Sequence, residues 1–167
     1  MNITQIGCDY YTGACHKWMC APKGSSFLYV AKNFQKGMSP QIMSWGEEGD
    51  DPGPSQFLMD FQWQGTKDMS AFLAIPSAIR FLQKNKWKEK SVISKNLISN
   101  LAGRLKDTLG TKGLFKNKNW IGQMISHPLP MDSPVNLKDM LWNDFKIEVP
   151  IFNWGKRNFI RVSAHFY

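Results

Sequence analysis

Short apolar runs separated by turn-forming residues dominate the first third of the chain. Residues 9–12 and 26–31 combine aromatic, β-branched and aliphatic side chains in the way that is typical of β-strands. A segment rich in glycine, proline and cysteine separates them and predicts a turn. Residues 38–54 hold three glycines, three prolines and an acidic stretch, so we expect a loop there.

A helical pattern occupies the middle of the chain. Asp68 is a candidate N-cap for a helix that extends towards Lys84, and Pro76 inside that helix predicts a kink or a restart. Apolar residues spaced four apart predict one face of a second helix, which Gly110 is suited to end. These apolar residues are Ile93, Leu97, Leu101, Leu105 and Leu109.

The last third of the chain alternates between strand and helix patterns. Residues 120–126 predict a strand that ends at the proline-rich residues 127–130. Apolar positions between Leu137 and Phe145 predict an amphipathic helix. Two further strands, 147–152 and 159–167, are expected on either side of Gly155. The sequence thus predicts an α+β module with a boundary near Trp87.

The final predicted strand has one apolar and one polar face. Ile160, Val162, Ala164 and Phe166 alternate with Arg161, Ser163, His165 and Tyr167. A guanidinium held on a strand can grip a carboxylate with two hydrogen bonds, and it can equally form an ordinary salt bridge on the sheet surface. His127 and His165 are interpreted as structural residues.

Composition and charge narrow the function classes. The 167 residues are 43% apolar and 13% aromatic, which argues against disorder, and the formal net charge is +8. The lysines cluster on a predicted helix and in a loop, where solvated faces account for them, and no zinc-finger or RNA-recognition spacing is present. We therefore expect neither nucleic acid nor a membrane as a partner.

The three cysteines do not suggest a disulfide framework. With no signal-peptide pattern and no apolar run of transmembrane length, a cytoplasmic location is expected. Cys8, Cys15, His16 and Cys20 form a group of potential metal ligands. Their spacing matches no common zinc site, so small buried thiols are the favoured interpretation and no metal is predicted.

Lys17 is the residue with the clearest chemical potential. It follows His16 and lies in a stiff segment with Trp18, Pro22 and Gly24. Only a neutral amine attacks a carbonyl, and burial or a neighbouring cation can lower a lysine pKa enough to make it useful. An ordinary surface lysine is the competing interpretation.

Four segments resemble the class V aminotransferase family, the fold-type I enzymes that use pyridoxal 5′-phosphate, and in particular its isopenicillin N epimerase-like branch. The first is the His-Lys segment within residues 8–30, where Cys15 stands in place of the usual Gly, Ser, Thr or Ala. The second is the Gly-Thr segment and the helix after it, residues 61–79. Residues 147–150 and 159–167 resemble the C-terminal strands of the family.

The resemblance implies roles for individual residues. Lys17 would form the Schiff base with pyridoxal 5′-phosphate, beside which His16 would lie near the cofactor phosphate. Thr66 would reach the phosphate of the cofactor bound in a partner subunit, so that a complete site needs a dimer. Arg161 would bind the α-carboxylate of an amino-acid substrate. In this family residues 38–54 would lie near the substrate entrance, where either a mobile gate or a plain surface loop fits.

The resemblance also implies an α/β fold class and a domain organisation. Residues 1–86 would be the C-terminal remainder of the cofactor-binding large domain, and residues 87–167 a small α+β C-terminal domain truncated at its end. The N-terminal half of the family, with its phosphate-binding turn and the aspartate that pairs with the pyridine nitrogen, is expected to be missing.

The resulting hypothesis is a C-terminal fragment of an enzyme that is inactive alone. Epimerisation or racemisation, transamination and cleavage at the β-carbon all stay open, and cysteine desulfurase chemistry is less favoured. The alternative is a non-catalytic interaction module that pairs with an intact relative.

Overall fold

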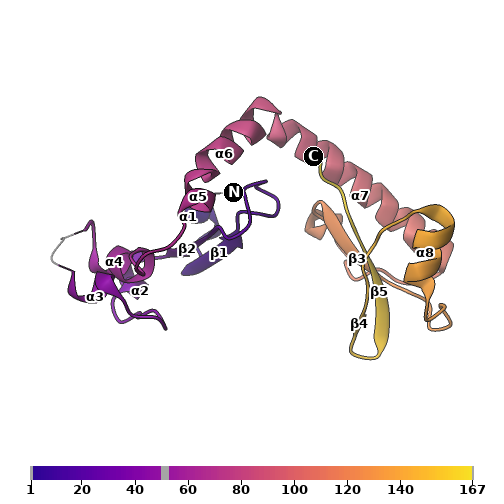
Figure 1. Ribbon diagram of the computed structural model, residues 1–167. Helices are drawn as coiled ribbons and strands as arrows, with labels where there is room; N and C mark the ends of the chain where they lie inside the picture. The colour runs from indigo at the N-terminus through magenta and orange to yellow at the C-terminus, as the bar shows by residue number, and fades with distance from the viewer. Residues whose placement is uncertain (1, 50–52, 167) are drawn as a thin grey trace. The chain divides into compact units, whose positions relative to one another are not determined.

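The computed structural model describes residues 2–49 and 53–166 and divides into two compact units, Met1–Lys84 and Asn85–Tyr167 (Figure 1). Each unit combines a small antiparallel sheet with helices, so the expected mixture of α and β structure is confirmed. Among the described residues, every helix is too short or too polar to cross a bilayer.

The first unit is built around a β-hairpin. Strands β1 (Tyr10–Ala14) and β2 (Ser26–Val30) pair antiparallel, and the Thr12 hydroxyl donates a hydrogen bond of 2.8 Å to the Phe27 carbonyl. The two predicted strands are therefore confirmed to within two residues at each end. Six helices complete the described part of the unit: α1 (Ile3–Ile6), α2 (Lys32–Gln35), α3 (Trp45–Glu48), α4 (Gln56–Gln62), α5 (Ser70–Leu73) and α6 (Ile75–Lys84).

The predicted loop at residues 38–54 contains the helical turn α3, so the loop prediction is wrong for this part. The Gly46 amide donates to the Trp63 carbonyl, and the Gln56 side chain donates to the Gly46 carbonyl. A side chain on residue 46 would collide with the Met59 backbone, so glycine is required where this turn meets α4. Asp50, Asp51 and Pro52 of the predicted acidic loop lie outside the described residues.

The predicted restart near Pro76 is confirmed. Helix α5 ends at Leu73 and α6 begins at Ile75, because a proline inside a helix lacks the N–H and its ring excludes the carbonyl four residues earlier. The Asp68 carboxylate accepts hydrogen bonds from the amide and hydroxyl of Ser70 at 2.8 and 3.0 Å. These bonds hold the pKa of the Asp68 carboxyl below its ordinary value. Asp68 therefore caps the start of α5 from one residue before Met69, which occupies the N-cap position itself.

The second unit places a long helix against a three-stranded sheet. Strand β5 lies between β3 and β4, antiparallel to both, and helix α7 packs on β3 (Figure 1). The core contains Ile98, Ile121 and Ile125, with Val162 and Ala164 packed against it. The elements are α7 (Trp87–Leu109), the 3₁₀ helix η1 (Lys118–Trp120), β3 (Met124–Pro128), α8 (Leu137–Phe145), β4 (Ile151–Trp154) and β5 (Arg157–Ser163).

Helix α7 ends at Gly110 as predicted, with φ of 64°, and its buried face follows the predicted one at Leu101 and Leu105 but not in the first half of the helix. Ile93 and Leu97 are exposed, whereas Ser94 and Ile98 are buried. Four residues turn an α-helix by about 400°, so each step along an i, i+4 row rotates by about 40° and the row drifts out of contact. The contact runs instead through Ile98, Leu101 and Leu105.

Two strand boundaries differ from the predictions because local hydrogen bonds compete with the sheet. The Asn117 side chain accepts from the Asn119 amide at 2.9 Å and starts η1, so β3 begins only at Met124. After α8, the Ile147 amide donates to the Leu141 carbonyl at 3.0 Å, in a Schellman-type ending that delays β4 to Ile151.

Strand β5 is also shorter and less one-sided than predicted. It ends at Ser163. Beyond it the His165 ring stacks on Trp87 with ring centres 5.2 Å apart, and the Phe166 ring is tilted against Trp87 with ring centres 5.5 Å apart. Val162 packs towards α7 as expected, yet Phe159 is buried on the opposite, predicted polar, face, where it stacks on Phe152. Tyr167 lies outside the described residues.

Candidate functional site

Lys17 lies in the connection between β1 and β2, the turn predicted from the sequence. Several short backbone hydrogen bonds fix this connection. The Cys15 amide donates to the Ser25 carbonyl and the Ala21 amide donates to the Cys15 carbonyl, both at 3.0 Å. The Cys20 amide closes the tip by donating to the Lys17 carbonyl at 3.0 Å. The backbone that carries Lys17 is therefore held from both sides.

The base of this turn is buried and composed of small side chains. Cys15, Ala21 and Ser25 are almost inaccessible, and the Ser25 hydroxyl donates to the Pro22 carbonyl at 3.0 Å. Cys15 and Ala21 share a core cluster with Ala78 of α6. A cysteine satisfies the requirement for a small residue at position 15, and the interpretation of Cys15 as a small buried thiol is confirmed.

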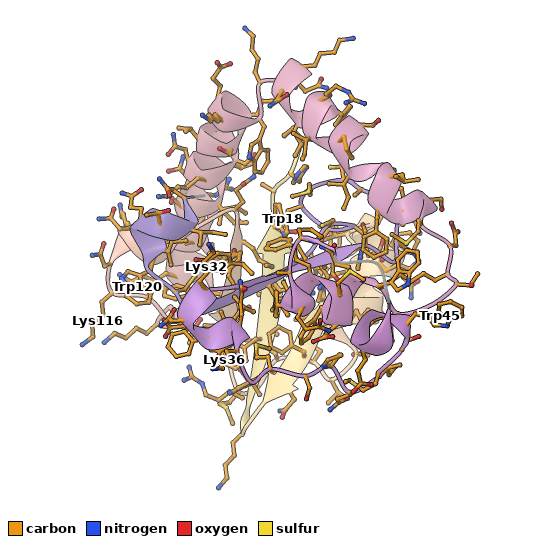
Figure 2. All side chains as sticks on the ribbon, turned by 90° about the vertical axis from the view of Figure 1, so that its left-hand side faces the viewer. Trp18, Lys32, Lys36, Trp45, Lys116 and Trp120 are labelled. Carbon is orange, nitrogen blue, oxygen red and sulfur yellow. The ribbon has the colours of Figure 1, made fainter. Side chains whose placement is uncertain are left out.

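The tip of the turn, by contrast, is accessible. His16 and Lys17 are both exposed, and among the described residues neither side chain has a hydrogen-bond or ion-pair partner. Figure 2 shows Trp18, the next residue, on the same turn. The structure thus presents the Lys17 amine and the His16 imidazole from adjacent positions on a fixed backbone.

Two unusual backbone conformations shape the turn, and the sequence pattern gave no sign of the first. Cys20 has a φ of 60°, which side-chain-bearing residues rarely adopt, and Gly24 has a φ of 96°. Burial raises the pKa of the Cys20 thiol above its ordinary value. The contact with Ala78 was equally invisible, because it joins residues far apart in the sequence. Gly24, together with Pro22, was the local signal of a sharp turn.

Thr66 belongs to the same unit as Lys17 but to a different loop. It lies between α4 and α5, exposed, directly after Gly65 with its φ of 88°. Its side chain has no hydrogen-bond partner among the described residues. Helix α5 begins four residues later, at Ser70, and spans only four residues, so Thr66 is not the cap of a substantial helix.

Arg161 lies on the central strand of the sheet in the second unit. Its amide donates to the Pro150 carbonyl at 2.9 Å, and it pairs with Ser126 across β3. The side chain is exposed, and within the described part of the chain no carboxylate forms an ion pair with it. The two interpretations of Arg161, a residue that binds a carboxylate ligand and half of an ordinary surface salt bridge, therefore both stay predictions.

His16 and Lys17 are adjacent on one turn of the first unit. Thr66 shares their unit, and Arg161 is placed within the second unit alone. As for metals, within residues 2–49 and 53–166 no three His, Cys, Asp or Glu side chains gather closely enough to hold an ion.

Comparison with known proteins supplies the family. The sequence model described as Aminotransferase class-V matches residues 1–149. The isopenicillin N epimerase of Amycolatopsis lactamdurans is 30% identical over an alignment of 184 residues, which covers 100% of this chain and 45% of the relative. That of Streptomyces clavuligerus is 28% identical with the same coverage.

An L-cysteine desulfhydrase of Arabidopsis thaliana is 25% identical over 95% of this chain and 36% of its own length. The chain thus spans less than half of the length of these curated relatives. Since the family match covers most of its residues, including the turn that presents His16 and Lys17, the chain belongs to the aminotransferase class-V family.

Proposed function

We propose that this chain is the C-terminal part of a pyridoxal 5′-phosphate enzyme that acts on an amino acid, with Lys17 as the residue that carries the cofactor. The observation that supports it best is the turn between β1 and β2. It holds an exposed primary amine, without a partner among the described residues, on a backbone fixed by buried neighbours.

The residues present fit the aldehyde end of this cofactor. A primary amine is the group that condenses with an aldehyde, and an imidazole beside it can hydrogen-bond an anionic phosphate. The small buried base of Cys15 and Ala21 keeps the turn compact, and the exposed Lys17 lies at its tip. When bound, the cofactor supplies an electron sink for the bond to be broken at the substrate Cα.

Lys17 then has a second task. As a free amine beside the substrate, Lys17 would remove a proton from Cα or return one. Return of the proton to the opposite face of Cα gives epimerisation, the reaction for which the similar isopenicillin N epimerases are named. Loss of a group from the β-carbon gives the reaction named for the desulfhydrases. The chain's own residues support both outcomes equally.

Arg161 is proposed to hold the substrate carboxylate. Its guanidinium is exposed on the central strand and unpaired within the described part of the chain, and a planar fork of donors suits a carboxylate. Binding there would orient the substrate about Cα. Thr66, with its exposed hydroxyl, is proposed to contact the cofactor phosphate of a second subunit, which makes a dimer part of the proposal.

The proposal requires a further polypeptide segment. Because the chain covers 45% of the epimerases, we propose that the remaining cofactor contacts come from a segment that corresponds to their N-terminal half. Alone, this chain should bind the cofactor weakly and show no activity.

Complementation tests this proposal. The chain is mixed with a polypeptide that comprises the N-terminal half of the Amycolatopsis lactamdurans epimerase, and cofactor retained through gel filtration is measured by absorbance. We expect stoichiometric retention with both pieces and almost none with this chain alone. Retention that is absent from the mixture, although the two pieces co-elute, would instead favour the non-catalytic interaction module.

A further inference from the structure

A cavity in the second unit has no role in the proposed function. It lies between helix α7, the connection at residues 110–121 and the edge strand β3, and its volume is about 860 Å³. Pockets for small organic ligands in proteins commonly have volumes of about 300–1,000 Å³. All of its lining residues belong to the unit Asn85–Tyr167, so the cavity is defined without reference to the Lys17 turn. We call it the α7–β3 cavity.

The charges of the α7–β3 cavity have one sign. Lys106, Lys112, Lys116 and Lys118 line it, and none of its described lining residues is acidic. All four lysines are exposed. Figure 2 shows Lys116 and Trp120, which both extend from the connection at residues 110–121. Like charges gathered around a concave surface raise the local potential and attract anions, with an effect that salt screens. Ammonium groups are common ligands of phosphate oxygens.

A buried histidine supplies a fixed polar group to the same cavity. His127 lines it with 2% of its surface exposed, and Nε2 lies 2.9 Å from the Thr111 hydroxyl oxygen. Because that hydroxyl donates its single proton to the Pro128 carbonyl at 2.7 Å, Nε2 is the donor towards Thr111. Nδ1 of the neutral ring is left as an acceptor, 3.7 Å from where a Cβ of Gly113 would lie.

The remaining lining suits an organic body attached to the anion. Ile121, Ile125 and Phe115 provide apolar surface, and Ser99 and Asn100 add neutral polar groups. Gly103 faces open space, since a Cβ built there meets no atom within 4 Å. A cationic mouth, an apolar wall and a hydrogen-bond acceptor together match a ligand with a charged end and a partly apolar, donor-bearing end.

We propose that the α7–β3 cavity binds a small organic phosphate that carries at least two negative charges. The phosphate groups contact the four lysines, and an N–H or O–H group of the organic body donates to Nδ1 of His127. No residue of the Lys17 turn lines this cavity, so the site stands independently of the proposed function.

Calorimetric titration of the full chain tests this site, with pyrophosphate and adenosine 5′-diphosphate as probes and neutral adenosine for comparison. We expect one site, tighter binding of the diphosphate nucleoside than of pyrophosphate, and weaker binding as salt is raised. Replacing Lys112, Lys116 and Lys118 by Gln should weaken the affinity by more than about tenfold, since each removes a charge-assisted contact. The matched control replaces Lys88, Lys95 and Lys138, exposed helical lysines outside the cavity, by Gln and should change it less than about twofold.

A steric variant separates a cavity site from general charge attraction. Gly103→Leu fills open space in α7 and favours the helix, so the protein should remain folded by circular dichroism while binding falls by more than about tenfold. Equal losses in the two triple-lysine variants, unchanged binding by Gly103→Leu, or adenosine binding as tightly as its diphosphate would each overturn the proposal.

Discussion

His127 and Thr111 form a hydrogen bond of 2.9 Å between Nε2 and Oγ1, although 16 residues separate them in the sequence. The Thr111 hydroxyl also donates to the Pro128 carbonyl at 2.7 Å. Thr111 directly follows Gly110, the cap of α7. Its side chain therefore connects the end of this helix to two consecutive residues of the edge strand β3, His127 and Pro128. The geometry makes Thr111 a structural connection between helix and sheet.

Thr111→Val should destabilise the chain. Valine keeps the shape of threonine but removes both hydrogen bonds and leaves a buried His127 N–H and the Pro128 carbonyl without their partner. The expected loss is about 1–3 kcal/mol in the free energy of unfolding, measured by denaturant titration. Thr66→Val is the control, because the Thr66 side chain is exposed and without a partner in the described part of the chain, and it should have little effect. Equal effects of the two variants would contradict this role.

Stability should fall as the pH is lowered through the range in which histidine titrates. Burial lowers the pKa of His127 below the ordinary value of 6.5, and an interaction with the Thr111 backbone opposes this to a lesser degree. The unfolded chain therefore binds a proton at a higher pH than the folded chain does. The stabilisation is fully present above the unfolded pKa, declines below it, and is lost once the pH falls through the folded pKa.

Denaturant titrations at a series of pH values measure this decline. His127→Gln should flatten it, whereas His16→Gln should leave it intact, because His16 is exposed and without a partner among the described residues. A pH dependence that survives in His127→Gln would show that another group is responsible.

Two neighbouring residues of α7 should differ widely in their contribution to stability. Ile98 is 1% exposed in the core of the second unit, whereas Leu97 is 60% exposed. Ile98→Ala should cost about 2–5 kcal/mol, because it removes buried methyl groups and leaves a cavity. Leu97→Ala should change stability by less than about 0.5 kcal/mol. If denaturant titration shows similar losses of stability in the two variants, α7 packs on the core with a face other than the one in the structure.

In the complemented protein, Arg161→Gln should weaken the binding of amino-acid substrates. It removes the charge and the two-pronged donor from an exposed position on β5, so KM should rise by more than about tenfold, the equivalent of one charge-assisted contact. Arg157→Gln is the control: it lies on the same strand and face, with its guanidinium 5.7 Å from the Phe159 ring. If both variants raise KM alike, Arg161 has no specific role in binding the carboxylate.

Local patterns predicted elements well where one local interaction decides the structure. The β1–β2 hairpin, the restart before Pro76, the end of α7 at Gly110 and helix α8 all follow from turn residues, proline chemistry or short-range periodicity. Strand ends were less predictable. Asn117 starts the 3₁₀ helix η1, and the hydrogen bond of Ile147 extends the end of α8. The residues involved therefore do not join the sheet, although the apolar content of these segments favours strands.

The candidate site shows the same division. The His16–Lys17 turn and the exposed position of Arg161 were accessible to sequence reasoning, since motif and alternation are both local. The contact of Ala78 with the base of the turn could not be predicted from the sequence, because it depends on packing between distant segments. The buried face of α7 was misassigned at Ile93 and Leu97 for a related reason: the strand against which the helix packs, β3, selects the face, and the helix pattern alone does not.

The role of Lys17 can be tested by identifying the lysine that binds pyridoxal 5′-phosphate. The complemented protein is incubated with the cofactor, reduced with borohydride to make the lysine adduct permanent, digested, and mapped by mass spectrometry. Lys23 provides an internal control, because it is exposed in the same connection between β1 and β2. We expect one adduct per chain, on Lys17, and we expect Lys17→Ala to abolish it while Lys23→Ala does not. An adduct spread over several lysines, or one that persists in Lys17→Ala, would contradict it.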